Sequence, residues 1–133
     1  MAILKDAKQN GNYVELSIKR HIPGESEGSR MYFQYVELNR MQYELEFGWT
    51  NMVVESYIEA TSQFPLPQLH GLYSSFEKHL YELSWINMDM SNDQYKLHFY
   101  GSDQDFELIA LAEDIRTFGN DLNAEWQHII SIS

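Results

Sequence analysis

Glu44 and Glu55 are the two residues of this sequence that come nearest to a catalytic pair. They fall in neighbouring stretches, 41–49 and 52–60, in which apolar and polar residues alternate as they do in strands. If the stretches form a hairpin that keeps its apolar residues on one face, the two carboxylates lie directly opposite each other. Two acids so placed can act as general acid and general base in hydrolysis, as they do in glycosidases. Such chemistry needs a cleft with aromatic subsites, which larger domains usually supply.

The sequence lacks the other common signatures of catalysis and metal binding. It has no cysteine, and its five histidines do not have the spacing of a compact zinc site. It also has no G-x-S-x-G nucleophile motif and no glycine loop of the kind that holds phosphates. We therefore predict no metal site, no cofactor and no enzymatic activity.

Charge is distributed unevenly along the 133 residues, whose formal net charge is −11. The first forty residues carry six basic and five acidic side chains, whereas the rest carry three basic and fifteen acidic ones. A strongly negative surface repels nucleic acid and anionic lipid, but it attracts a basic protein and speeds its association. The sequence therefore predicts a basic protein partner, no direct contact with nucleic acid and no membrane association.

The polar residues of the expected hairpin form a candidate binding face. Carboxylates there can pair with arginine or lysine of a partner, and a tyrosine supplies contact area at little entropic cost. The predicted partner-binding residues are Glu44, Glu46, Glu55, Tyr57 and Glu59. The competing interpretation is a solvated outer sheet face that binds nothing.

A second acidic group stands at the start of an expected helix. Asp103, Asp105 and Glu107 are residues of the kind that cap a helix and offset its dipole. They form a secondary acidic candidate, for which helix capping is the alternative role.

Alternating residues predict strands over 12–22, 31–38, 41–49 and 52–60. The stretches 31–38 and 52–60 also have apolar residues at helical spacing. A helix therefore remains the alternative for these two stretches.

Apolar residues at steps of three and four predict helices over 67–83 and 104–118, and Gly119 suits the end of the second. The remaining stretch, 122–132, fits either a helix or a strand, and both interpretations stay open.

A hairpin is expected between the two helices. Its strands are Trp85–Met90 and Gln94–Tyr100, joined by a turn at Asn92–Asp93. The register that best matches apolar residues also places Asp89 opposite Lys96, so pattern and charge agree.

These elements predict one globular α+β domain spanning residues 1–133. Its antiparallel sheet of about five or six strands is expected to pack against two helices. The composition, 44% apolar with 14% aromatic residues, supplies the material for such a core. No apolar run approaches the roughly 18 to 20 residues of a membrane span, and we expect a cytoplasmic protein.

In size, acidity, lack of catalytic motifs and the order strand, helix, strand, helix over residues 12–118, the chain resembles the acidic immunity proteins of bacterial toxin systems. The resemblance implies an inhibitor that binds and inactivates a basic protein such as a nuclease toxin. It also implies that Glu44, Glu46, Glu55 and Glu59 either plug the toxin's active site or hold the toxin at another surface. We favour the active site, because carboxylates can occupy the places of phosphates.

Three other functions stay open on the sequence. A phage-encoded DNA mimic that inhibits a host nuclease would have the same charge pattern. A small enzyme or ligand-binding domain would need a polar pocket between sheet and helices. A subunit of a larger assembly would set its acids against a basic face of another subunit, and the sequence leaves the oligomeric state undefined.

Overall fold

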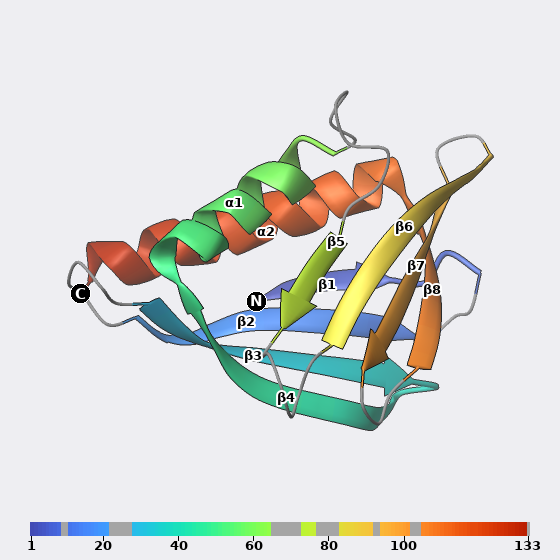
Figure 1. Cartoon of the computed structure of the whole chain (residues 1–133), viewed down its shortest axis with the longest axis horizontal. Coiled ribbons are helices and arrows are strands. Elements are labelled where there is room, and N and C mark those ends of the chain that lie inside the picture. Colours follow the sequence, from blue (N-terminus) through green and yellow to red (C-terminus); the bar gives the residue numbers. More distant parts are fainter. Residues whose placement is uncertain are drawn as a thin grey trace.

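Two four-stranded antiparallel sheets and two helices make up the part of the chain that the structure describes. The structure is a computed structural model, and it describes residues 1–8, 11–21, 28–64, 73–76, 83–91, 94–101 and 105–132. Both helices lie side by side along the first sheet, and the second sheet crosses the first (Figure 1).

The first sheet consists, in this order, of β1 (Ala2–Lys5), β2 (Tyr13–His21), β3 (Gly28–Glu37) and β4 (Arg40–Thr50). Every second residue of its strands points toward the core, and most of these residues are apolar. Leu16, Phe33 and Leu45 are paired side by side and buried, whereas the residues next to them in the sequence are more exposed or face outward. The three strands predicted before residue 50 are confirmed over the described residues, except that β2 begins at Tyr13 and that Leu38 belongs to the turn after β3. Residue 22 lies outside the described part of the chain.

The turn between β3 and β4 has an unusual backbone. Leu38 and Asn39 both have positive φ, 53° and 64°, which a two-residue hairpin turn of this twist requires. The turn is held by the preceding connection: Asn12 Oδ1 accepts from the Leu38 backbone N–H (2.9 Å), and the Gly11 carbonyl accepts from the Asn39 N–H (3.1 Å). Contacts from outside the turn therefore stabilise a conformation that leucine rarely adopts.

Helix α1 (Asn51–Ser62) follows β4 without a loop. The prediction of a strand over 52–60 is therefore wrong, and the helical alternative is correct. Thr50 provides the reason, because its side chain accepts a hydrogen bond from the Val53 N–H (3.3 Å) and caps the helix. The helical stripe of Val54, Tyr57, Ile58 and Thr61 is buried.

The second sheet consists, in this order, of β5 (Tyr73–Phe76), β6 (Leu83–Ser91), β7 (Gln94–Gly101) and β8 (Asp105–Leu111). The prediction of a helix over 67–83 is wrong at Tyr73–Phe76 and Leu83, which belong to strands. Its other residues lie outside the described part of the chain. Pairing with the neighbouring strand β6 overrides the helical spacing of the apolar residues here.

The β6–β7 hairpin is confirmed, but its register differs from the predicted one by one residue. Asp89 pairs with Tyr95, and Lys96 pairs with Met88. An irregularity between Asp89 and Ser91 accounts for the shift, because an extra residue in one strand moves every later pair. The predicted turn residues, 92–93, lie outside the described residues.

Helix α2 (Ala112–Ser131) follows β8 directly. The prediction of a helix over 104–118 is wrong over Asp105–Leu111, which pairs with β7 as a strand and buries alternate residues. Gly119 does not end the helix either, because α2 continues for three more turns. The helical interpretation of 122–132 is correct through Ser131. Neither helix of the described chain is long and apolar enough to cross a membrane.

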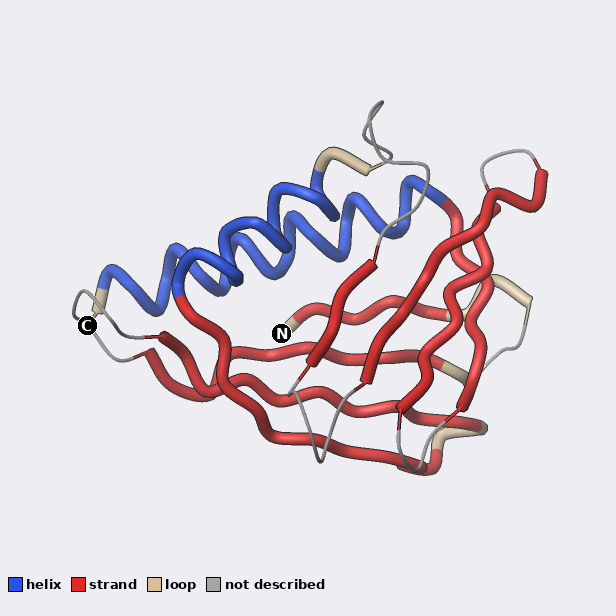
Figure 2. The backbone as a smooth tube through the Cα atoms, viewed as in Figure 1, coloured by secondary structure: helices blue, strands red, loops and turns tan. Residues whose placement is uncertain are grey.

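Side chains from both sheets and both helices form one hydrophobic core. Aromatic rings join the sheets: Tyr35 stacks on Phe106 with centroids 3.8 Å apart, and Phe33 lies 5.7 Å from Phe99. The helices cover the rest of the first sheet, α2 over β1 and β2 and α1 beside β4 (Figure 2). The α+β class and the packing of antiparallel strands against two helices are confirmed. The helices are α1 and α2, however, and not those predicted over 67–83 and 104–118, and the described strands divide into two sheets of four.

Candidate partner-binding surfaces

The predicted acidic face is divided between two surfaces of the molecule. Glu44 and Glu46 are exposed on β4 and alternate with residues that face the core, so they lie on the outer side of the first sheet. Glu55 and Glu59 are exposed on α1, which packs on the core side of that sheet. The predicted pairing of Glu44 with Glu55 is wrong, because it required residues 52–60 to be a strand.

Tyr57 is buried and does not belong to either acidic surface. Its side chain is only 7% exposed, and its ring lies 5.0 Å from Trp49 and 6.4 Å from Phe118, measured between centroids. Burial raises the pKa of the Tyr57 hydroxyl well above 10.0. The prediction of Tyr57 as an exposed aromatic anchor is wrong.

The outer sheet face is the side of β1–β4 that points away from the core. Strand pairing places its residues in rows that run across the strands. An apolar row near the β3–β4 turn is followed by two acidic rows and then by a basic one. The rows are Tyr13, Val36 and Met41; Glu15, Gln34 and Glu44; Ser17, Tyr32 and Glu46; and Arg20, Arg30 and Gly48.

A hydrogen-bonded network joins the acidic rows. The Tyr32 hydroxyl donates to Glu44 Oε2 (2.7 Å) and lies 3.2 Å from Gln34 Oε1, and Gln34 Nε2 donates to Glu15 Oε1 (3.2 Å). Partial burial raises the pKa of Tyr32 to about 12, and the hydrogen bond to Glu44 and the charges around the phenol add to the effect. The ammonium of Lys19 lies 4.7 Å from the centre of the Tyr32 ring.

Basic residues balance the carboxylates of the outer sheet face. Arg20 and Arg30 are paired in the row beyond Tyr32, and Lys5 lies beside Tyr13 at the other end. Together with Lys19, these cations outnumber Glu15, Glu44 and Glu46. The outer sheet face therefore has a local cluster of carboxylates but no net negative charge.

The exposed side of the two helices is different, because its charge is almost entirely negative. We call its exposed carboxylates the helical face: Glu55, Glu59, Glu113, Asp114 and Asp121. Arg116 is the one lysine or arginine within α1 and α2, and its guanidinium donates to the Phe64 carbonyl (2.8 Å). Within α1 and α2, no other lysine or arginine opposes the negative charge of the helical face.

An exposed apolar residue lies beside the helical face. Met52 is 75% exposed, and it stands three residues before Glu55 and seven before Glu59, on the same side of α1. Glu125 of α2 is not part of the face, because its carboxylate accepts from the Ile18 backbone N–H (3.2 Å).

The secondary acidic candidate is not a helix start. Asp105 and Glu107 lie in β8, where Asp105 Oδ1 is 2.6 Å from His98 Nε2 and Glu107 Oε2 is 3.1 Å from Lys96 Nζ. Both acids thus face basic residues of the neighbouring strand. Asp103 lies outside the described residues.

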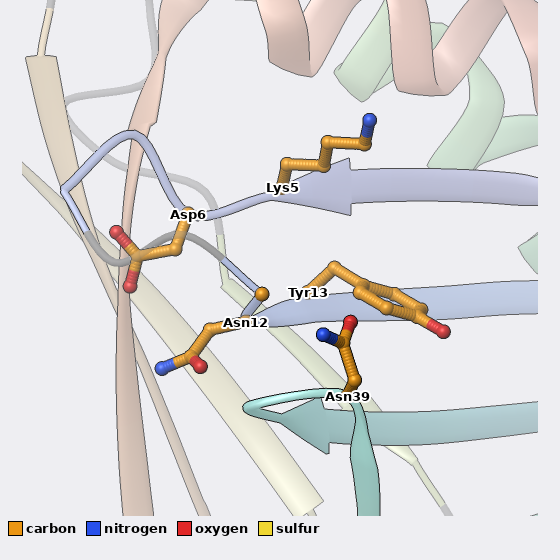
Figure 3. A pocket seen from close by; sticks show the side chains of 6 residues that line it. Lys5, Asp6, Asn12, Tyr13 and Asn39 are labelled. Carbon is orange, nitrogen blue, oxygen red and sulfur yellow. The ribbon is translucent and has the colours of Figure 1, made fainter.

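A polar pocket of about 290 Å³ opens at one end of the first sheet (Figure 3). It lies beside the β3–β4 turn and not between a sheet and the helices, where the ligand-binding alternative needs it. Its lining includes the oppositely charged Lys5 and Asp6, and the side-chain amide of Asn12, whose oxygen holds the β3–β4 turn. The lining residues are Lys5, Asp6, Gly11, Asn12, Tyr13 and Asn39. No cluster of His, Cys, Asp or Glu suited to a metal ion occurs in the described residues.

Sequence reasoning missed several residues of both surfaces. Tyr32, Gln34 and Glu15 could have been found, because their positions alternate with the buried residues of two confirmed strands. Asp121 was missed because the second helix was expected to end at 118.

Comparison with known proteins identifies no relative: no protein-family model, no curated protein and no solved structure matches this chain.

Proposed function

We propose that this chain is a non-enzymatic binding protein of the cytoplasm that neutralises a basic protein partner, as an immunity protein neutralises a nuclease toxin. The observation that carries the proposal is the helical face. Two adjacent helices expose five carboxylates, and their single arginine is engaged with the Phe64 carbonyl. The proposed contact surface thus keeps Glu55 and Glu59 of the predicted residues and adds Glu113, Asp114 and Asp121.

The helical face has the properties that binding a basic protein requires. Its field steers a positively charged partner toward it and raises the association rate, most strongly at low salt. Its carboxylates can take the places that phosphates occupy in the active site of a nuclease. Met52 supplies the exposed apolar contact that was assigned to Tyr57, since interfaces combine a desolvated anchor with charged surroundings.

A phage-encoded DNA mimic would use the same surface against a host nuclease. An immunity protein and a DNA mimic differ only in the identity of the partner that they bind. Identification of the captured partner therefore distinguishes the two functions.

The test compares two double variants with equal changes of charge. Glu55→Arg with Glu59→Arg alters the helical face, and Glu44→Arg with Glu46→Arg alters the outer sheet face. Each protein serves as bait in lysate of the source cell at low and moderate salt, and captured proteins are identified by mass spectrometry. The captured partner is then purified, and its activity is measured with and without each bait.

We expect wild type and the Glu44/Glu46 variant to capture and inhibit one basic protein, and the Glu55/Glu59 variant to lose it. The two exposed changes in each variant should leave the fold intact, which circular dichroism checks. Loss of the partner only in the Glu44/Glu46 variant would refute the proposal that the helical face binds the partner. Failure of the wild-type bait to inhibit any basic protein would refute the proposed function.

A further inference from the structure

We infer that the Tyr32 ring and the carboxylates around it form a binding site for one arginine side chain of a protein partner, and that Lys19 occupies this site in the free protein. The site lies on the outer sheet face, so it is separate from the helical face and independent of the proposed function. A cation already lies over the aromatic ring, at 4.7 Å from its centre, within the range of a cation–π interaction.

Three carboxylates surround the ring. Glu44 accepts the hydrogen bond of the Tyr32 hydroxyl, which leaves its other oxygen for a partner. Glu46 is paired with Tyr32 in the same row, and Glu15 is joined to the network through Gln34. Because these bonds fix the tyrosine and two of the acids, a cation that binds here does not have to order them.

Ser17 provides a separate observation that points to a ligand. It is paired with Tyr32 on the outer sheet face and is only 7% exposed, yet its hydroxyl has no hydrogen-bond partner among the described residues. A buried hydroxyl without a partner is costly. An N–H donor seated over Tyr32 would relieve that cost.

Lys19 fits the role of a displaceable occupant. It lies at the irregularity between Ile18 and Arg20, where the pairing of β2 with β3 shifts. Its side chain is exposed, and a change of rotamer can take it off the ring while the backbone pairing of β2 stays as it is.

The geometry favours arginine over lysine and one side chain over a polycation. A guanidinium is planar and carries five N–H donors, so it can stack on the ring while it donates to a carboxylate and to Ser17. Arg20 and Arg30 lie in the next row and repel a second cation on that side. The ligand must enter from the side of Glu15 and Glu44.

The experiment is an NMR titration of the full chain with N-acetyl-arginine amide, which mimics an arginine residue within a protein. N-acetyl-citrulline amide has nearly the same shape without the charge and is the control ligand. Free arginine is the third ligand, because it has the same net charge but carries an α-ammonium and an α-carboxylate that an arginine residue within a protein chain lacks. The variants are Lys19→Met, which removes the internal cation and keeps an apolar stem, Tyr32→Phe and Tyr32→Leu.

We expect saturable shifts at Tyr32 with the capped arginine, no tighter binding of free arginine and no binding of citrulline. Affinity should rise about fivefold in Lys19→Met and fall about fivefold in Tyr32→Leu, the size of one exposed cation–π contact. Tyr32→Phe keeps the ring but loses the hydroxyl that fixes Glu44, so its affinity should fall less than that of Tyr32→Leu. If Tyr32→Leu fails to fold, Lys19→Met decides the outcome. The Glu55/Glu59 variant should bind as wild type does, which separates this site from the helical face.

The inference is overturned by absence of saturable shifts, by equal binding of citrulline, or by unchanged or weaker binding in Lys19→Met. Tighter binding of free arginine than of the capped form would assign the site to a metabolite and would also overturn it.

Discussion

Gly119 of α2 lies directly against Thr61 of α1 where the two helices meet. A Cβ atom at Gly119 would overlap Thr61 Oγ1 and the backbone nitrogen of Ser62. The Thr61 hydroxyl has little freedom to move, because it donates to the Tyr57 carbonyl (2.8 Å) and lies 3.2 Å from the Ile58 carbonyl. The close approach of the helices therefore requires a glycine at this position.

Gly119→Ala should destabilise the protein even though alanine favours a helix. We expect a loss of about 1 to 3 kcal/mol, because overpacking against the α1 backbone exceeds the gain in helix propensity. Chemical denaturation measures the change, and the exposed Asn120→Ala on the same helix is the control. An increase in stability for Gly119→Ala would contradict the packing described here.

Tyr57 should behave as a core residue and Met52 as a surface residue. Tyr57→Ala should cost about 3 to 5 kcal/mol of unfolding free energy, as removal of a buried aromatic ring usually does. Met52→Ala should change stability by less than about 0.5 kcal/mol, since the side chain is exposed. Under the proposed function, Met52→Ala weakens partner binding. Thermal unfolding and binding assays on both variants test this, and equal effects on stability would show the assignment to be mistaken.

Leu38→Gly should stabilise the protein. Leucine at φ 53° carries a steric cost that glycine does not, and the Leu38 N–H that donates to Asn12 is kept. We expect a gain of about 1 kcal/mol, partly offset by the greater entropy of the unfolded chain. Asn39→Gly is the comparison, with a smaller effect because asparagine tolerates positive φ. A loss of stability in Leu38→Gly would mean that the leucine side chain makes a stabilising contact.

Alkaline pH should destabilise the fold through Tyr32 and Tyr35. Burial, together with a hydrogen bond to Glu44 or Glu37, raises each phenol's pKa from 10.0 to about 12. The unfolded chain then loses these protons first, so the free energy of unfolding falls as the pH rises from about 10 to 12. Phenolate absorbance during a pH titration measures the ionisation, and denaturation at each pH measures the stability.

Phenylalanine variants assign the effect. Tyr32→Phe and Tyr35→Phe should each remove one late-ionising phenol and flatten the pH dependence above 10. Ionisation of all nine tyrosines near pH 10 in the folded protein would contradict the described environments.

The strands of the first sheet could be predicted because one face is buried and the other is not. Residues 52–60 satisfied both periods, and the cap at Thr50 together with packing against α2 decided in favour of the helix. Residues 105–118 were harder, because β8 passes into α2 at Leu111 without a glycine or proline to separate them. Apolar residues of a strand and a helix then merge into one apparent helical stripe.

The candidate site could be predicted only as a set of exposed acids. Glu44, Glu46, Glu55 and Glu59 are all exposed, but their grouping depended on whether 52–60 was a strand. The prediction of Tyr57 as a surface residue failed for the same reason, because in the helix α1 its side chain points into the core. The Tyr32 site depends on contacts across β2, β3 and β4, and such pairing follows from register, which a single sequence specifies weakly.

The packing of α2 on β1 and β2 also determines when this protein can fold during synthesis. Leu4 and Leu16 of the first strands are buried in the core to which α2 contributes, yet α2 is translated more than ninety residues later. A nascent chain that ends before Ala112 must therefore leave this apolar surface uncovered on the ribosome, where it invites chaperone binding or aggregation. The native state becomes accessible only after the last helix has emerged from the exit tunnel.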